Sequence, residues 1–234
     1  MSAARRLACS LLWATAVVGL LCTRADAGTL VRFETILGVI EVDLLDEAMP
    51  TTVANFLSYV NAGSYDSTII HRSTTYNPNS IQIVQGGGYV LVGGTSLAPV
   101  ATFPPLVFES GTFTNARGTI AMARGAALDS ATSQFYFNVQ DNPALDGNYA
   151  VFGSITGPEG LATLDAIGAV DVYDVSPQLG PVFSELPLTA PSLQQSSLVM
   201  VNRVQAVPEP STIALAAVGA VALAFARPRR LRRD

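Results

Sequence analysis

The segment Ser133–Val139 constrains the fold most strongly, because its residues alternate between apolar and polar types with a period of two. Successive side chains of a β-strand point to opposite faces of the sheet. Phe135 and Phe137 then face a core, whereas Gln134 and Tyr136 face the other way. The amide and the phenol on that second face are hydrogen-bonding groups. We therefore expect a strand with one dry face and one polar face that could hold a ligand.

Alternating segments of this kind recur along the chain, and two stretches have helical spacing instead. The expected strands cover 29–35, 39–45, 69–72, 81–85, parts of 118–153, 171–175 and 198–204. One helix opens at Pro50 and stops near Gly63, and a second covers 160–167. The stretches 93–115 and 176–197 contain several prolines and are expected to be loops. These patterns, about eight strands and two helices, predict a mainly β fold with an antiparallel sheet. Closure of that sheet into a barrel would remove exposed strand edges and would suit a secreted domain.

Residues 1–27 have the three-part pattern of a secretory signal peptide. Two arginines precede an apolar run, and small residues precede the expected cut after Ala27. The mature chain would then begin at Gly28. Cys22 leaves a lipoprotein alternative open, although Leu21 stands where such a signal wants a small residue.

Residues 207–234 combine Pro208-Glu209-Pro210, an apolar run at about 211–226 and a final cluster of arginines. The run would form a transmembrane helix, and the arginines would stay in the cytoplasm, leaving the preceding domain outside. This order resembles the PEP-CTERM sorting tail of Gram-negative bacteria, which implies an exosortase as a partner. The protein would then be exported, periplasmic or at the cell surface, and attached to the membrane through its tail before processing. A plain membrane anchor is the alternative.

The domain between these segments, residues 28–206, carries 5 arginines, no lysine and 15 acidic residues, which gives a net charge of −10. Such a domain cannot neutralise a row of phosphates, so we expect no nucleic-acid partner. Both cysteines lie in the signal segment, and His71 is the only histidine in the chain. We therefore expect no metal site and no cofactor.

Several familiar catalytic patterns are incomplete in this chain. No G-x-S-x-G elbow accompanies His71, and no Lys-Ser/Thr follows Gly86-Gly87-Gly88. The acidic residues near Asp146 do not have the spacing of a calcium loop. His71 follows two isoleucines, so we expect it to be a buried, hydrogen-bonded structural residue.

What remains is a set of four polar side chains with apolar neighbours. The polar ones are Arg72, Gln85, Gln134 and Tyr136, and the apolar ones are Ile83, Met122 and Leu145. An arginine and amides around an apolar hollow supply no nucleophile, but they can bind a peptide and hydrogen-bond its backbone. Alternatively, the arginine is a surface ion-pair partner and the glutamines are solvated.

A series of motifs, taken in order along the chain, resembles those of the cyclophilins. They are His71-Arg72, Gln85-Gly86-Gly87, residues 118–124 (GTIAMAR), Ser133-Gln134-Phe135, and Leu145-Asp146-Gly147 followed by Val151-Phe152-Gly153. Cyclophilins are peptidyl-prolyl cis-trans isomerases with an eight-stranded barrel and two capping helices. The resemblance covers about 29–204, and within it 133–143 and 150–153 are similar to the bacterial exported branch.

By position, the resemblance implies a role for each candidate residue. Arg72 matches the catalytic arginine, and Gln85 matches a glutamine beside it. The implied substrate-binding residues are Ile83, Met122, Ala123, Arg124, Gln134, Tyr136 and Leu145. Arg72 would hydrogen-bond the prolyl nitrogen of a twisted X-Pro bond, in proline-containing segments of exported or surface proteins.

The proline pocket departs from the family pattern at four positions. Gln82 and Ile83 stand where the family has a phenylalanine and a methionine, and Tyr136 replaces a second phenylalanine. Ala144 replaces an aromatic residue, which is a tryptophan in drug-sensitive members, so we expect weak cyclosporin binding.

By this resemblance, the loop between Arg72 and Gln85 is longer than is usual in cyclophilins, and its Tyr76 or Ile81 could refill the pocket. The alternative to an active isomerase is a non-catalytic peptide-binding or matrix-assembly module on the same scaffold.

Overall fold

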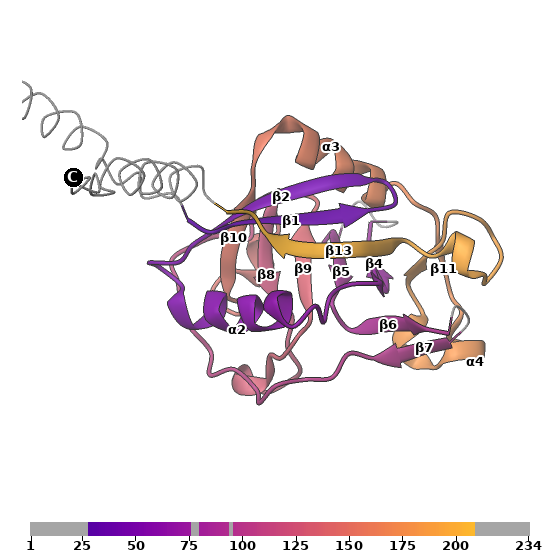
Figure 1. The fold of residues 1–234 in the computed structure, drawn as a ribbon, viewed down its shortest axis with the longest axis horizontal. Coiled ribbons are helices and arrows are strands. Elements are labelled where there is room, and N and C mark those ends of the chain that lie inside the picture. Colours follow the sequence, from indigo (N-terminus) through magenta and orange to yellow (C-terminus); the bar gives the residue numbers. More distant parts are fainter. Residues whose placement is uncertain (1–27, 76–79, 94–95, 209–234) are drawn as a thin grey trace, which may run out of the picture.

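The structure is a computed structural model that describes residues 28–75, 80–93 and 96–208, in which a curled β-sheet lies between helices (Figure 1). The strands are β1 (Leu30–Thr35), β2 (Gly38–Leu44), β3 (Thr68–Ile69), β4 (Arg72–Ser73), β5 (Ile83–Gly86), β6 (Tyr89–Val92), β7 (Ser96–Pro99), β8 (Thr119–Met122), β9 (Phe135–Asn138), β10 (Val151–Ile155), β11 (Val172–Tyr173), β12 (Leu186–Pro187) and β13 (Met200–Ala206). The α-helices are α2 (Pro50–Asn61), α3 (Gly157–Gly168) and α4 (Ser176–Leu179). Short 3-10 helices cover Leu128–Ser130, Pro143–Leu145, Pro181–Phe183 and Gln195–Ser197.

Eleven strands form one sheet in the order β4-β5-β9-β8-β10-β2-β1-β13-β3-β6-β7, with antiparallel neighbours throughout. The mainly β, antiparallel character predicted from the sequence is therefore confirmed. The predicted closed barrel of eight strands is wrong, because the sheet is curled, has more strands and ends at β4 and β7.

The sheet fails to close within 68–73, where the sequence predicted one continuous strand over 69–72. The N–H of Ile70 donates to the carbonyl of Val199 at 2.9 Å, whereas the N–H of His71 donates to the carbonyl of Gln85 at 3.0 Å. The chain thus changes its pairing partner between two adjacent residues. β3 pairs with β13 and β6, and β4 forms the opposite edge of the sheet beside β5.

Two of the predicted loops contain regular elements. β7 lies within 93–115 and pairs with β6, and α4 and β12 lie within 176–197. β12 pairs with β11 in a second sheet of two strands. Both strands were missed in the sequence because prolines in these stretches indicated loops. Pro99 is the last residue of β7 and Pro187 the last of β12, and a strand tolerates proline at such a position. The prediction of only two α-helices is corrected by α4, a single turn.

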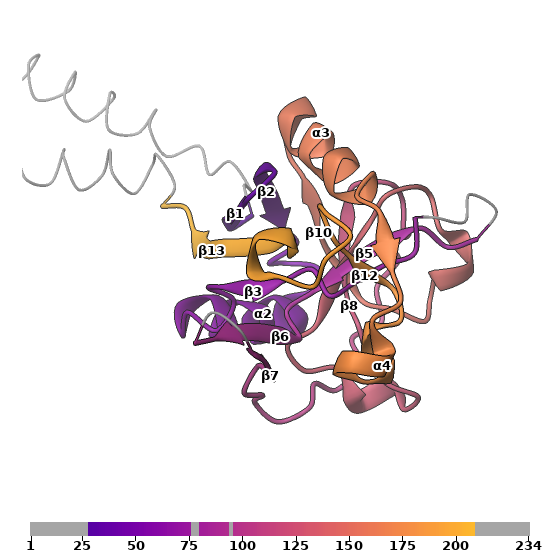
Figure 2. The ribbon, with the colours of Figure 1, turned by 90° about the vertical axis from the view of Figure 1, so that its right-hand side faces the viewer.

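α2 and α3 lie on opposite sides of the curled sheet (Figures 1 and 2). The periodicity of α2 predicts an apolar stripe of Val53, Phe56, Leu57 and Val60, and the helix buries three of these residues, whereas Leu57 is half-buried against the core. α3 begins at Gly157, slightly before the predicted start, and buries Leu164. Both helices pack into the largest apolar cluster of the described residues.

The core confirms one face of the strand β9 and corrects the other. Phe135 and Phe137 belong to the largest cluster and each stacks edge-on against Phe33, with ring centroids 5.4 and 5.3 Å apart. The opposite face carries polar groups, as predicted, and Tyr136 lines a cavity, but the face is more buried than the pattern indicated: Tyr136 is 2% exposed and Asn138 is fully buried. A smaller apolar cluster covers that face, so β9 is sandwiched between two packed layers.

The predicted signal peptide at 1–27 and the predicted transmembrane segment at about 211–226 lie outside the described residues. Within the described part of the chain, no helix combines the length and the apolar character that crossing a membrane requires.

Candidate functional site

A cavity of about 520 Å³ opens beside the edge strand β4 and brings most of the predicted site residues together. Its lining consists of Arg72, Thr74, Ser80, Ile81, Ile83, Gln85, Ala123, Arg124, Tyr136, Leu145, Tyr149 and Glu185. Seven of the nine predicted site residues are in this set. The other two, Met122 and Gln134, are not among the lining residues.

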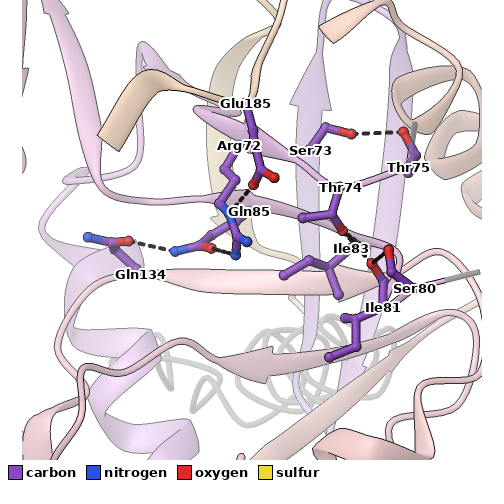
Figure 3. Close-up of polar contacts among 10 residues, drawn as sticks. All are labelled: Arg72, Ser73, Thr74, Thr75, Ser80, Ile81, Ile83, Gln85, Gln134 and Glu185. Atoms are coloured by element: carbon purple, nitrogen blue, oxygen red, sulfur yellow. Dashed lines mark hydrogen bonds and ion pairs between the residues drawn. The ribbon is translucent and has the colours of Figure 1, made fainter. Parts of the chain in front are cut away.

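The pairing of β4 with β5 places Arg72 directly opposite Gln85. Across this pair, Nη1 of Arg72 donates to Oε1 of Gln85 at 3.4 Å (Figure 3). The alternation along β5 also sends Ile83 to the same side as Gln85, as the sequence predicted. An arginine, an amide and an aliphatic side chain therefore share one wall of the cavity.

Gln134 lies beside Gln85 and extends the hydrogen bonds of this wall (Figure 3). Nε2 of Gln85 donates to Oε1 of Gln134 at 2.8 Å. The predicted alternative of solvated glutamines does not hold for Gln85, because its amide bonds protein groups on both sides. The bond to Gln134 also fixes which end of the Gln85 amide faces Arg72.

His71 sits next to Arg72 in the chain but points away from the cavity into the core. It is fully buried and stacks against Tyr89 at 5.1 Å, which confirms the predicted buried position. Neither ring nitrogen has a hydrogen-bond partner among the described residues. Burial lowers the pKa of His71 to about 4, and the nearby Gln134 amide offsets only part of this effect, so the ring is neutral at pH 7.

The apolar floor of the cavity is built from a separate cluster that contains Ile83, Tyr136 and Leu145. Ile81, from the end of the longer loop, packs against this cluster and lines the cavity, as the sequence suggested for it. Tyr76 lies outside the described residues. Burial raises the pKa of Tyr136 far above its ordinary value, so its hydroxyl stays protonated and donates a hydrogen bond.

Met122 is 1% exposed and packs in the largest core cluster, so its side chain lies beneath the sheet rather than in the lining. Arg124 lies at the rim with Tyr149, and its guanidinium carbon is 4.9 Å from the centre of that ring. Its Nε donates to the carbonyl of Asn148 at 2.8 Å. The Arg124 side chain therefore braces neighbouring loops, and Ala123 stands beside it in the lining.

Glu185 is the functional candidate that the sequence analysis missed. Its Oε2 accepts a hydrogen bond from Nε of Arg72 at 2.6 Å (Figure 3). The alternative prediction that Arg72 forms an ion pair is therefore correct, although the pair lies in the lining of the cavity. The residue lies 113 positions further along the chain, in a stretch predicted to be loop. One signal was present, a single acidic residue between apolar residues in PVFSELPL, but nothing in the sequence indicated its partner.

The arrangement combines two arginines, Arg72 paired with Glu185 and Arg124 at the rim, with the Gln85 amide and an apolar floor. No three His, Cys, Asp or Glu side chains in the described ranges come together in a way that could hold a metal ion. A guanidinium and an amide at the mouth of an apolar cavity can hydrogen-bond the polar backbone of a peptide while the floor takes an apolar side chain. Fold and site together define a mainly β protein with a peptide-sized groove.

Comparison with known sequences identifies the family. The profile described as cyclophilin type peptidyl-prolyl cis-trans isomerase/CLD matches residues 30–182, and the PEP-CTERM protein-sorting motif matches residues 206–230. Peptidyl-prolyl cis-trans isomerase A of Dickeya dadantii is 41% identical over 159 residues, which cover 65% of this chain and 78% of that protein. Peptidyl-prolyl cis-trans isomerase B of Escherichia coli is 37% identical over 150 residues, covering 60% and 85%. The chain belongs to the cyclophilin-type peptidyl-prolyl cis-trans isomerases.

A solved structure shares the fold. The crystal structure of a Cryptosporidium parvum cyclophilin type peptidyl-prolyl cis-trans isomerase matches with a TM-score of 0.54 and 22% sequence identity, covering 78% of this chain and 99% of that one. The curled sheet with few helices is therefore a cyclophilin fold, and the PEP-CTERM motif indicates export and sorting in a Gram-negative bacterium.

Proposed function

We propose that this protein isomerises X-Pro peptide bonds of exported or surface proteins, and that Arg72 carries the catalysis. The observation that carries the proposal is the meeting of Arg72 and Gln85 at the mouth of a cavity with an apolar floor. A proline ring would rest on the floor near Ile83 and Leu145. Its amide nitrogen would then come within reach of the guanidinium.

The required acceleration is within the reach of hydrogen bonding. An X-Pro bond rotates over a barrier of about 20 kcal/mol, which takes tens of seconds without a catalyst. A turnover on the order of 10 per second needs a barrier lower by about 4 kcal/mol. A hydrogen bond from a charged donor contributes about 1.5–3 kcal/mol, and exclusion of water from the apolar floor can add to it.

The arginine must act on the twisted amide rather than on the planar one. Twisting breaks the amide resonance and returns a lone pair to the prolyl nitrogen, which can then accept a hydrogen bond. Only an interaction that is stronger in the twisted state accelerates the rotation. No nucleophile, base or metal takes part in such a step, which is consistent with a neutral His71 turned into the core.

Each remaining predicted residue has a part in this proposal. Gln85 holds the arginine and faces the substrate, Gln134 holds Gln85 in place, and Tyr136 and Leu145 form the floor. Ala123 and Arg124 line the groove with main-chain groups that face the peptide. Met122 acts from below by supporting the strand β8 on which this wall rests.

The proposed setting is outside the cytoplasm. We assign residues 1–27 to a signal peptide, 28–206 to the catalytic domain and 207–234 to a sorting tail with a membrane-spanning segment. The match of 206–230 to the PEP-CTERM motif supports the last of these assignments. An exosortase would then act on the tail, and the substrates would be proteins that share the same export route.

The test is a prolyl isomerisation assay on the purified full chain and on Arg72→Ala. We expect the substitution to lower kcat/KM by at least about a hundredfold, as the loss of ~3 kcal/mol in the transition state implies. Equal rates for the two proteins would contradict the role of Arg72. If the wild-type chain binds a proline-containing peptide but has no rate above buffer, the protein is a binding module instead.

A further inference from the structure

We propose that Glu185 is a positioning residue that fixes the guanidinium of Arg72 for isomerisation. This inference rests on the proposed function, because it assigns a partner to the catalytic arginine. Glu185 lies beyond residues 30–182, the part of the chain that matches the family profile. The partner of Arg72 therefore comes from the segment that follows the profile match.

The main chain holds Glu185 firmly against the strand that carries Arg72. The carbonyl of Glu185 accepts a hydrogen bond from the N–H of Ser73, the next residue on β4, at 2.9 Å. Phe183 and Leu186, on either side of Glu185, are buried in the second apolar cluster. The carboxylate is thus presented from an anchored segment rather than from a free loop tip.

The guanidinium is held at two points. Nε donates to Oε2 of Glu185 at 2.6 Å, and Nη1 donates to Oε1 of Gln85 at 3.4 Å (Figure 3). Two such bonds fix the plane of a guanidinium, whose donors have a rigid fork geometry. Nη2 has no hydrogen-bond partner among the described residues, so it is the group that can turn to a substrate.

Fixing this plane matters because the proposed reaction depends on the direction of one hydrogen bond. The Arg72 side chain is 40% exposed, so without a partner it would sample many rotamers at the mouth of the cavity. A catalytic group that is displaced by about 1 Å can lose as much as a hundredfold in rate. Glu185, at 22% exposure, removes that freedom before the substrate binds.

The Arg72–Glu185 pair differs from an ordinary surface ion pair in its position beside the cavity, and not in the distance between its charged groups. Arg32 and Glu41 form a similar pair, also at 2.6 Å and with partly exposed side chains. That pair joins β1 to β2. In the sheet, β8 and β10 separate β2 from β9, the strand that carries Tyr136 of the cavity lining. Glu41→Ala is therefore a matched control, which removes a carboxylate from an arginine without touching the cavity.

The experiment measures kcat and KM of the full chain with a proline-containing peptide. We expect Glu185→Ala to lower kcat by about tenfold with KM changed less than about twofold, because the loss is one of orientation. Glu185→Gln keeps an oxygen that can accept from Nε, so we expect it to restore at least half of the rate. Glu41→Ala should leave both constants unchanged, while its thermal stability reports the cost of a lost ion pair.

A second comparison separates this inference from the proposed function. In the Arg72→Ala background, Glu185→Ala should change the residual rate less than about twofold, because Glu185 acts through the arginine. If Arg72→Ala loses activity but Glu185→Ala keeps or exceeds the wild-type rate, the positioning role fails and the role of Arg72 stands. An equal loss in both backgrounds overturns it as well. Wild-type activity in Arg72→Ala overturns the proposed function itself.

Discussion

The hydroxyl of Tyr136 donates a 2.7 Å hydrogen bond to Oδ1 of Asn115, and both residues are almost fully buried beneath the cavity. Asn115 in turn is held by Asp146, whose Oδ1 accepts from the Asn115 main-chain N–H at 2.6 Å. This connection joins β9 to two loops. The floor of the cavity is therefore apolar toward the substrate and hydrogen-bonded from below.

Tyr136→Phe should separate stability from activity. The substitution removes the hydroxyl but keeps the ring, and Oδ1 of Asn115 retains only a weaker contact with Asn138 at 3.3 Å. We expect the free energy of unfolding to fall by about 1 kcal/mol, the net contribution of one buried hydrogen bond. The kcat/KM should stay within about twofold of wild type, because the cavity surface is unchanged. Denaturant unfolding and the isomerisation assay check the two halves, and a large loss of rate would contradict this view of the floor.

Gln85→Ala tests the hydrogen-bond chain from the other side. Gln85 contacts Arg72 directly, whereas Gln134 reaches it only through Gln85. We expect Gln85→Ala to lower kcat/KM by about tenfold and Gln134→Ala by less than about threefold. The double variant should behave like Gln85→Ala alone, since the two residues act in series. Additive losses would show that Gln134 contacts the substrate independently.

His71 should make the protein less stable at acidic pH. The buried ring has a pKa of about 4, below the ordinary value of 6.5, so the unfolded state binds more protons between these two pH values. Stability from the neutral ring is therefore complete above about pH 6.5 and falls as the pH drops toward 4, by up to about 3 kcal/mol.

His71→Gln removes this titrating group, and the difference in unfolding free energy between pH 7 and pH 5 should be smaller than in wild type. Carboxylates contribute equally in both proteins, so the comparison isolates the imidazole. Parallel stability profiles would mean that His71 is already protonated or already solvated in the folded protein.

Glu109 supplies a cap for α2 that the sequence analysis did not predict. Its carboxylate accepts hydrogen bonds from the N–H groups of Thr51 and Thr52 at 3.2 and 2.7 Å. Burial alone would raise the pKa of Glu109, but these hydrogen bonds outweigh it and lower the pKa. The stabilisation is therefore present above the pKa of the unfolded state and is lost as the pH falls through the folded value.

We expect Glu109→Ala to lower the free energy of unfolding at pH 7 by about 0.5–1 kcal/mol, the usual contribution of a helix cap that is partly exposed. The effect should shrink as the pH falls toward 3. Glu159→Ala, in the first turn of α3, is a control without such bonds to helix N–H groups in the described structure. A loss that is equal at pH 7 and pH 3 would contradict the cap.

The sequence predicted what depends on local periodicity and on the family motifs. The alternation in 133–139 predicted that Phe135 lies in the core, where the structure has it. The family motifs predicted a shared site for Arg72, Gln85 and Ile83, and all three line one cavity. The predicted closed barrel was wrong because the chain changes its pairing partner between Ile70 and His71, and such a change has no signature in the local sequence pattern.

The missed residues act across long sequence separations. Glu185 meets Arg72 from 113 positions away, and Glu109 meets Thr52 from 57 positions away. Neither pairing follows from spacing, because both are set by how loops fold back over the sheet. The depth at which Tyr136 is buried was missed for a similar reason, since the apolar layer that packs on it comes from other parts of the chain.

Ala144 should determine how strongly this protein binds cyclosporin. The residue is exposed in the 3-10 helix Pro143–Leu145, next to Leu145 of the cavity lining, and the resemblance to the cyclophilins predicts an aromatic side chain at this position. An indole at this position would cover the ligand with more apolar area, worth about 1.5–3 kcal/mol. We therefore expect weak binding by wild type and a gain of about ten- to a hundredfold in affinity for Ala144→Trp. Titration calorimetry and inhibition of the isomerase rate measure it, with the exposed Ala162→Trp on α3 as control. Unchanged affinity in Ala144→Trp would instead assign the weakness to Gln82, Ile83 and Tyr136, the other positions that depart from the family.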